Sequence, residues 1–248
     1  MPTLAATPDF VHYLPIATTA VSAVFLVLLL RRAKLRNWPG HLNWWAIGVF
    51  FYGVGTAFES TITLAGNSAE LTRWWYWAGA ILGGYPLATG SVYLLFKTRW
   101  IAHALTGASL AVVIFASVAI FLTPLNPEFV DPVRPSGRVL EWQWIRWLTP
   151  FINIYAVIFL IGGAAHSSVR FFLAGDQPRR AAGTALIAFG ALLPGIGGSL
   201  TKTHDLPEAL YIGELTGILL IWLGYELCTR APAPRLAGQP RAGTPSAA

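Results

Sequence analysis

The sequence predicts an all-α integral membrane protein, a bundle of seven transmembrane helices. Its composition supports this class, because 55% of the 248 residues are hydrophobic and only 11% are charged, whereas soluble domains average about 25% charged residues. In addition, seven separate stretches reach the length of about 20 mostly apolar residues that crosses a bilayer. A soluble fold could not bury this much apolar surface, so soluble classes are excluded.

The seven predicted spans form a single domain over residues 1–229, with short or proline-rich connections. They cover residues 13–30, 43–64, 74–96, 101–122, 145–169, 181–200 and 207–228. Pro86 and Pro194 predict kinks or breaks in the third and sixth spans. The tryptophans lie near predicted span ends, as in an interfacial aromatic belt, and only Trp222 falls inside a span. Residues 230–248, rich in Pro, Ala and Gly, are predicted to form a disordered cytoplasmic tail.

The distribution of basic residues predicts the orientation. Of the 17 Lys and Arg residues, five fall on one side of the predicted bundle and the other twelve on the opposite side. The five are Arg73, Arg134, Arg138, Arg146 and Lys202. The side richer in basic residues faces the cytoplasm, so we expect the N-terminus outside and the C-terminus in the cytoplasm. Since these residues lie in short loops, the net charge of +6 indicates topology and excludes nucleic acid as a partner.

A carboxylate, Glu59, lies well inside the second predicted span. It shares one helical stripe with the small or polar residues Gly48, Tyr52, Gly55 and Thr63, whereas the opposite face is bulky and apolar. The bulky face comprises Ile47, Phe50, Phe51, Val54, Phe58 and Ile62. Small and polar residues face neighbouring helices, so Glu59 is predicted to point into the bundle. A charge at such depth is costly and usually has a partner.

The predicted partner is Glu214 in the seventh span, at nearly the same depth and on a stripe with Tyr211. Two ionised carboxylates at one level repel each other, so one would be protonated, or a cation or an arginine would lie between them. Asn153 and Tyr155 of the fifth span project to similar levels, and with Tyr52 they would complete a polar chamber that opens outward. The alternative is two unrelated structural carboxyl groups, each hydrogen-bonded to a neighbouring helix. Glu226, nearer the end of the same span, is predicted either to extend its carboxyl group to the membrane interface or to pair with Arg230 at i+4.

Several chemistries lack the residues that they need. Covalent retinal requires a lysine within the last span, but Lys34, Lys97 and Lys202 are the only lysines and all fall in loops. The histidines show no metal-binding spacing, so neither a metal nor another cofactor is expected. The sequence carries no phosphate-binding loop or nucleophile motif, which makes an enzyme the less favoured class.

The segments 57–60 (AFES) and 76–95 (YWAGAILGGYPLATGSVYLL) resemble uncharacterised seven-helix bacterial membrane proteins. Glu59, Tyr76, Gly79, Gly90 and Tyr93 carry this resemblance, which covers the second and third spans only. It implies a bacterial plasma membrane setting and no particular activity.

Two functional classes follow from these residues. One is a small-ligand-binding or sensory module, in which the outward polar chamber binds a ligand and a membrane or cytoplasmic partner protein responds. The other is a small proton-coupled transporter that uses Glu59 and Glu214. The inner halves of the spans show no matching polar path, which favours the first class. In both, the lipid bilayer is the constant partner.

Overall fold

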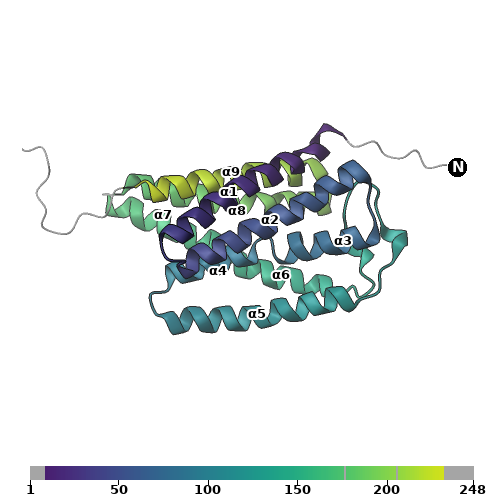
Figure 1. The fold of residues 1–248 in the computed structure, drawn as a ribbon, viewed down its shortest axis with the longest axis horizontal. Helices are drawn as coiled ribbons and strands as arrows, with labels where there is room; N and C mark the ends of the chain where they lie inside the picture. Colours follow the sequence, from purple (N-terminus) through teal and green to yellow (C-terminus); the bar gives the residue numbers. More distant parts are fainter. Residues whose placement is uncertain (1–8, 176, 205, 232–248) are drawn as a thin grey trace, which may run out of the picture.

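The structure is a computed structural model that describes residues 9–175, 177–204 and 206–231, and these residues are mostly helical with no strand among them (Figure 1). Seven helical stretches are long and apolar enough to cross a membrane, which confirms the predicted all-α class and the predicted number of membrane-length helices. The elements in chain order are η1 (Phe10–Tyr13), α1 (Leu14–Leu35), α2 (Gly40–Ala65), α3 (Ala69–Trp75), η2 (Tyr76–Ile81), α4 (Tyr85–Leu95), α5 (Arg99–Leu122), η3 (Pro127–Phe129), η4 (Gly137–Val139), α6 (Ile145–Ala156), η5 (Val157–Gly162), α7 (Gly163–Ala174), α8 (Pro178–His204) and α9 (Pro207–Thr229).

Two of the seven spans are composite. The third comprises α3, η2 and α4, and the fifth comprises α6, η5 and α7. Both η2 and η5 are π-helical, with wider turns than an α-helix. Between η2 and α4 the helix is interrupted, and Pro86 lies in the first turn of α4. A proline there costs no internal hydrogen bond. The irregularity predicted at Pro86 is therefore a break that precedes it.

The last two spans, α8 and α9, form a hairpin in which backbone packs against backbone. Glycines recur every seven residues along α8, at Gly183, Gly190 and Gly197. A Cβ atom added at Gly190 would lie 2.7 Å from the carbonyl oxygen of Gly217, so only glycine permits this approach. α8 runs as one helix through Pro194, and the break predicted at that residue does not occur.

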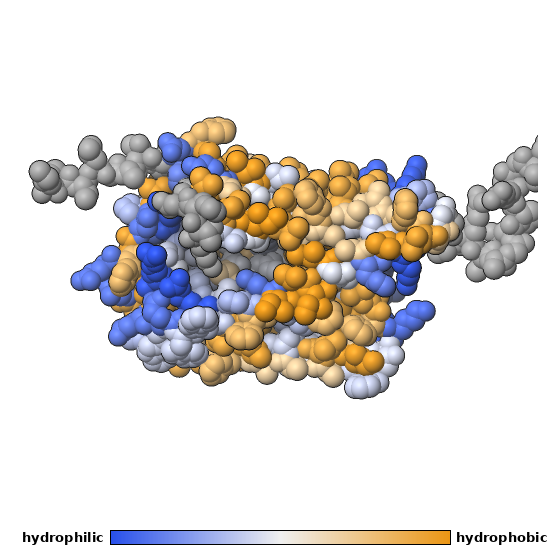
Figure 2. All heavy atoms as spheres, turned by 180° about the vertical axis from the view of Figure 1, so that it is seen from behind, coloured by the Kyte–Doolittle hydropathy of each residue, from blue (hydrophilic) through white to orange (hydrophobic). Residues whose placement is uncertain are grey.

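The bundle has two polar ends separated by an apolar middle. Figure 2 shows hydrophobic side chains over the middle of one long face and hydrophilic ones gathered toward its ends. The basic end, as we name it, contains Arg31, Arg32, Lys34, Arg36, Lys97, Arg99, Arg170, Arg179, Arg180 and Arg230. The N-terminal end carries η1, the connection between α2 and α3, and the long segment 123–144 with η3 and η4. The side of the membrane that each end faces stays a prediction, and 232–248 of the predicted tail lie outside the described residues.

Candidate functional site

The candidate site is built on α2, which lies close against the third span because its glycines leave room. A Cβ atom added at Gly48 would lie 2.6 Å from Cγ of Leu87, and one at Gly55 would lie 3.0 Å from Cα of Gly79. This packing turns the glycine-containing stripe of α2 into the bundle. Glu59 belongs to that stripe and is only 2% exposed. It points inward, as the periodicity predicts.

The opposite face of α2 follows the prediction over part of its length. Ile47 and Phe50 are exposed, as expected for side chains that face lipid. Ile62 lies on the same predicted face but is buried. The assignment of Ile62 to the lipid-facing surface was wrong, because η1 and α3 both pack against α2 near the N-terminal end.

The carboxyl groups of Glu59 and Glu214 lie next to each other inside the bundle, close enough to interact directly. Indole Nε1 of Trp75 donates a hydrogen bond to Oε1 of Glu59 at 2.7 Å, and the hydroxyl of Tyr52 donates to the backbone carbonyl of Glu214 at 2.8 Å. Oε2 of each carboxyl group is covered from solvent and receives no hydrogen bond from a donor in the described part of the chain. Two acceptors in contact, with no donor for either Oε2, need a proton or a cation between them.

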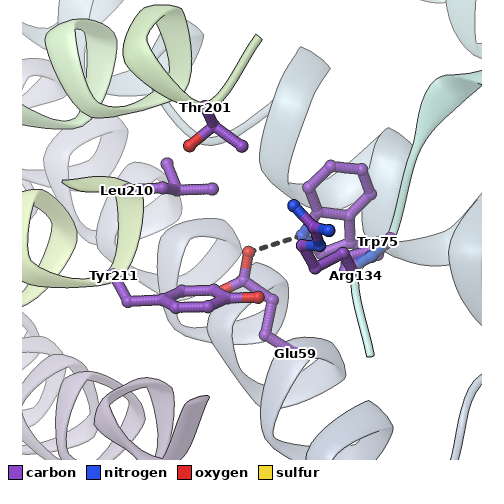
Figure 3. Close-up of a pocket in the computed structure, with 7 residues that line it drawn as sticks. Glu59, Trp75, Arg134, Thr201, Leu210 and Tyr211 are labelled. Carbon is purple, nitrogen blue, oxygen red and sulfur yellow. Dashed lines mark hydrogen bonds between the residues drawn. The ribbon is translucent and has the colours of Figure 1, made fainter. Parts of the chain in front are cut away.

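A small cavity of about 30 Å³ adjoins Glu59 (Figure 3). It has room for a water molecule or a small ion. Its lining residues come from four spans and the loop between the fourth and fifth: Glu59, Trp75, Arg134, Pro135, Thr201, Leu210 and Tyr211. In Figure 3 the ring of Tyr211 lies beside the Glu59 carboxyl group, and the guanidinium of Arg134 lies by the Trp75 indole. The cavity thus combines acidic, basic and aromatic groups at the N-terminal end.

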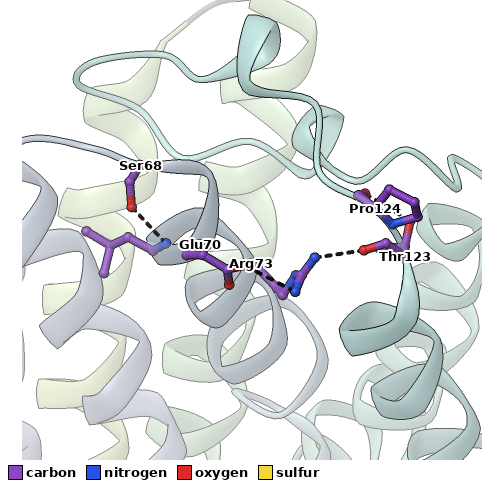
Figure 4. A network of polar contacts seen from close by, with 6 residues as sticks. Ser68, Glu70, Arg73, Thr123 and Pro124 are labelled. Carbon is purple, nitrogen blue, oxygen red and sulfur yellow. Dashed lines mark hydrogen bonds and ion pairs between the residues drawn. The ribbon is translucent and has the colours of Figure 1, made fainter.

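The segment that carries Arg134 is tied to α3 and to the end of α2. Nδ2 of Asn67 donates to the carbonyl of Asp131 at 2.7 Å, and the Asp131 side chain accepts the backbone N–H of Arg134 at 2.9 Å. Further along, Arg73 donates to the carbonyl of Thr123 at 2.7 Å and pairs with Glu70 at 3.3 Å (Figure 4). These bonds hold the loop over the cavity.

His12 lies next to the cavity and was not among the predicted site residues. Its side chain is 7% exposed, its ring contacts that of Tyr211 edge-on with centroids 5.6 Å apart, and its Nδ1 is covered without a partner among the described residues. The Thr63 hydroxyl donates to the His12 carbonyl at 2.9 Å. η1 is therefore fixed to α2 one helical turn beyond Glu59.

Four of the six predicted site residues come together and two do not. Glu59, Glu214, Tyr52 and Tyr211 form one cluster. Asn153 is exposed on α6, away from this cluster.

Tyr155 instead packs against Tyr85 and Phe159, with ring centroids 5.5 and 4.8 Å apart. The fifth span fails to complete the chamber because α6 packs against α4 and α5 rather than against α2 and α9.

Sequence reasoning missed Trp75, Arg134, Thr201 and Leu210. Trp75 was interpreted as part of the aromatic belt, although its spacing of 16 residues from Glu59 across a short loop is compatible with contact between adjacent helices. Nothing in the sequence singles out Arg134 among the loop arginines, because the contacts that hold its segment are long-range.

Toward the basic end the pair is closed off by apolar side chains. Val49 on α2 and Ile218 and Ile221 on α9 are at most 2% exposed and belong to one core cluster. The site can therefore hold a proton or a small ion beside two carboxyl groups, within a bundle whose other half is packed. Among the described residues, no three His, Cys, Asp or Glu side chains gather in a way that could hold a metal ion.

Comparison with protein-family models, with curated proteins and with solved structures gave no match. Functional inference for this chain therefore depends on the geometry of the site.

Proposed function

We propose that this membrane protein is a binding or sensory module whose ligand is a proton or a small cation held by Glu59 and Glu214. The observation that supports this proposal is that the carboxyl group of Glu214 lies against that of the buried Glu59 inside the bundle. A pair held only for structure would gain more from donors on neighbouring helices, because like charges in contact are costly. The adjoining cavity of about 30 Å³ matches a small ion or water rather than an organic ligand.

The hydrogen bonds suggest which carboxyl group carries the proton. Glu59 accepts from Trp75, and an accepted hydrogen bond stabilises the ionised form. The side chain of Glu214 receives no such bond from the described residues, so we assign the proton to Glu214, which then donates to Glu59. Protonation of this group would alter the attraction between α2 and α9, and a partner protein could read the change in helix packing.

The proposed setting is the plasma membrane of a bacterium, with the basic end in the cytoplasm. This proposal follows from the excess of Lys and Arg at that end. In this orientation the cavity adjoining Glu59 lies on the outer side, where it would respond to external pH or to external cations.

A proton-coupled transporter is the second candidate, and one observation favours it. On the basic side of the apolar segment, Nε1 of Trp45 and the hydroxyl of Tyr225 are covered and have no partner among the described residues. Their rings lie 6.1 Å apart. These polar atoms could form the inner part of a proton path, but Val49, Ile218 and Ile221 separate them from the carboxyl pair in the present conformation.

The test measures thermal unfolding of purified protein against pH for the wild type and for Glu214→Gln. A glutamine keeps the shape of a protonated glutamate and can donate to Glu59. We expect the melting temperature of the wild type to fall as rising pH removes the shared proton, and Glu214→Gln to remove most of this fall. A variant that is destabilised equally at every pH would show that the carboxyl group is structural and would overturn the proposal.

Proteoliposomes that contain a pH-sensitive dye separate the two candidates. A binding or sensory module should show no protein-dependent proton flux. Flux that Glu59→Gln and Glu214→Gln both abolish, while each variant remains folded, would establish the transporter instead.

A further inference from the structure

A second hollow lies on the outer surface of α1 and α9, closer to the basic end than the carboxyl pair is. These two helices run side by side (Figure 1), and a groove of about 480 Å³ lies along them. Its wall is apolar over most of its length and ends in an ion pair: Leu28, Leu219, Trp222, Leu223, Glu226 and Arg230. Because both helices span the membrane, this groove faces the acyl chains of one leaflet.

Trp222 gives the groove a rigid wall. It is the tryptophan that does not fit the interfacial belt, since it lies two turns inside the end of α9. Its indole stacks on the buried ring of Phe25 at 5.9 Å with an interplanar angle of 16°. The ring is thus held by α1 while it lines the groove, which accounts for a tryptophan at this depth.

The mouth of the groove is the end formed by Glu226 and Arg230, and it presents an oriented guanidinium group. Nε of Arg230 donates to Oε2 of Glu226 at 2.9 Å, as the i+4 spacing predicts. The Arg230 side chain is 78% exposed, and its two terminal nitrogens make no hydrogen bond within the described part of the chain. Glu226 therefore fixes the guanidinium through Nε and leaves the terminal nitrogens available to an oxyanion.

More positive charge surrounds this mouth. The Arg32 guanidinium lies one turn beyond Leu28 on α1, over the ring of Tyr225 at 5.8 Å from its centroid. Arg31 and Lys34 are exposed next to it. Both α1 and α9 end here, and the C-terminal end of a helix repels anions. Attraction of an anion to this mouth must therefore come from the basic side chains.

We propose that the groove between α1 and α9 is a binding site for an anionic glycerophospholipid. One acyl chain would lie along Leu28, Leu219 and Leu223 against Trp222, with the phosphate on the terminal nitrogens of Arg230. Charge complementarity favours this occupant over a neighbouring transmembrane helix, because an apolar groove that ends in a presented guanidinium matches a molecule with an apolar tail and an anionic head.

Native mass spectrometry of the purified full chain tests the proposal with two probes, dioleoyl phosphatidylglycerol and dioleoyl phosphatidylcholine. The wild type should retain phosphatidylglycerol in preference to phosphatidylcholine. Arg230→Ala should weaken phosphatidylglycerol binding by about fivefold, the effect of one basic contact near a membrane surface, and leave phosphatidylcholine binding unchanged. Arg99→Ala is the matched control, because Arg99 is exposed at the same end of the bundle but begins α5.

A second variant tests the apolar wall. Leu223→Trp fills the groove without changing charge and should reduce retention of both lipids, while a thermal unfolding measurement confirms that it is folded. Arg230→Lys tests the mouth without changing charge, because it keeps the positive charge and loses the planar guanidinium. Equal losses for Arg230→Ala and Arg99→Ala would show general attraction to the basic end and would overturn the proposal, as would unchanged binding in Arg230→Ala.

Discussion

The α8–α9 hairpin and the contact between α5 and the third span hold helices together in opposite ways. In the hairpin, glycines bring two backbones together, and a Cβ atom at Gly217 would lie 2.6 Å from the carbonyl oxygen of Gly190. At α5, side chains bridge the gap between the backbones, as where Nε1 of Trp77 donates to the hydroxyl of Ser117 at 2.9 Å. The first contact depends on glycines, which have no side chain, and the second depends on side chains that bridge the two helices.

Three polar contacts join α5 to the third span at regular intervals. Trp77, Tyr85 and Tyr93 follow one another at spacings of eight residues and bond in turn to three residues of α5. The partners are Ser117 at 2.9 Å, Ser109 at 3.2 Å and His103 at 2.9 Å. In a membrane, polar contacts of this kind and close van der Waals packing replace the hydrophobic effect as the forces between helices. An atom added between the two backbones of the hairpin is expected to force them apart, whereas the α5 contact should weaken by a small step for each polar contact removed.

The largest expected effect is that of Gly190→Ala. The added methyl group meets the Gly217 carbonyl and the backbone nitrogen of Ile221, which lies 3.0 Å away, and neither can move without separating the helices. We expect a loss of about 2 kcal/mol in the free energy of unfolding. Gly195→Ala is the control on the same helix, because an added Cβ there has open space around it. Thermal unfolding in detergent compares them, and equal effects would contradict backbone packing in the hairpin.

Next in size is the double variant Trp77→Phe with Tyr85→Phe. Each substitution removes one hydrogen bond and keeps an aromatic ring, so each should cost about 0.6 kcal/mol. Because the two residues are separated by the break before α4 and bond to different serines of α5, the costs should add. Denaturant titration of both single variants and the double variant checks this sum. A double-variant cost well above the sum would indicate that α5 detaches as a unit.

A smaller effect is expected for Tyr93→Phe, which removes the third polar contact. The pair of Tyr93 and His103 is exposed near the basic end, where water and lipid headgroups can replace the lost partner. We expect a cost below about 0.5 kcal/mol, measured in the same titration. A cost as large as that of Trp77→Phe would show that the depth of the contact in the bundle does not matter.

The smallest effect is expected for Gly107→Ala on α5. The methyl group has open space and alanine suits a helix better than glycine. The free energy of unfolding should stay within about 0.5 kcal/mol of the wild type. A clear loss of stability would reveal a neighbour at this face, such as a second copy of the chain, and size measurement by light scattering would identify it.

Span number and the direction of Glu59 could be predicted because both depend on local pattern. Span length appears in a run of apolar residues, and the stripe that contains Gly48, Gly55 and Glu59 appears in helical periodicity. The break before Pro86 was placed only approximately. The π-helical turns at 76–81 and 157–162 were not predicted, because a run of apolar residues does not distinguish a π-helical turn from an α-helical one.

The site could be predicted only where the pattern of residues within one helix identifies the face that points into the bundle. Depth along α2 and α9 places Glu59 and Glu214 at one level, and the structure brings them together. Asn153 has a similar predicted depth but lies on a span that packs elsewhere, and depth alone carries no information about which helices are neighbours. Trp75 reaches the site through its indole, and Arg134 reaches it from a loop. The positions of both depend on the whole fold.

The glycine contacts of the hairpin also have a mechanical consequence. Because sliding would drive backbone atoms of one helix into the other, we expect α8 and α9 to move together as one stiff unit. Glu214 lies on α9, about 24 Å along the helix axis from Arg230. We therefore expect a displacement of Glu214 away from Glu59 to tilt both helices together and to move the basic end of α9, beside the groove of α1 and α9.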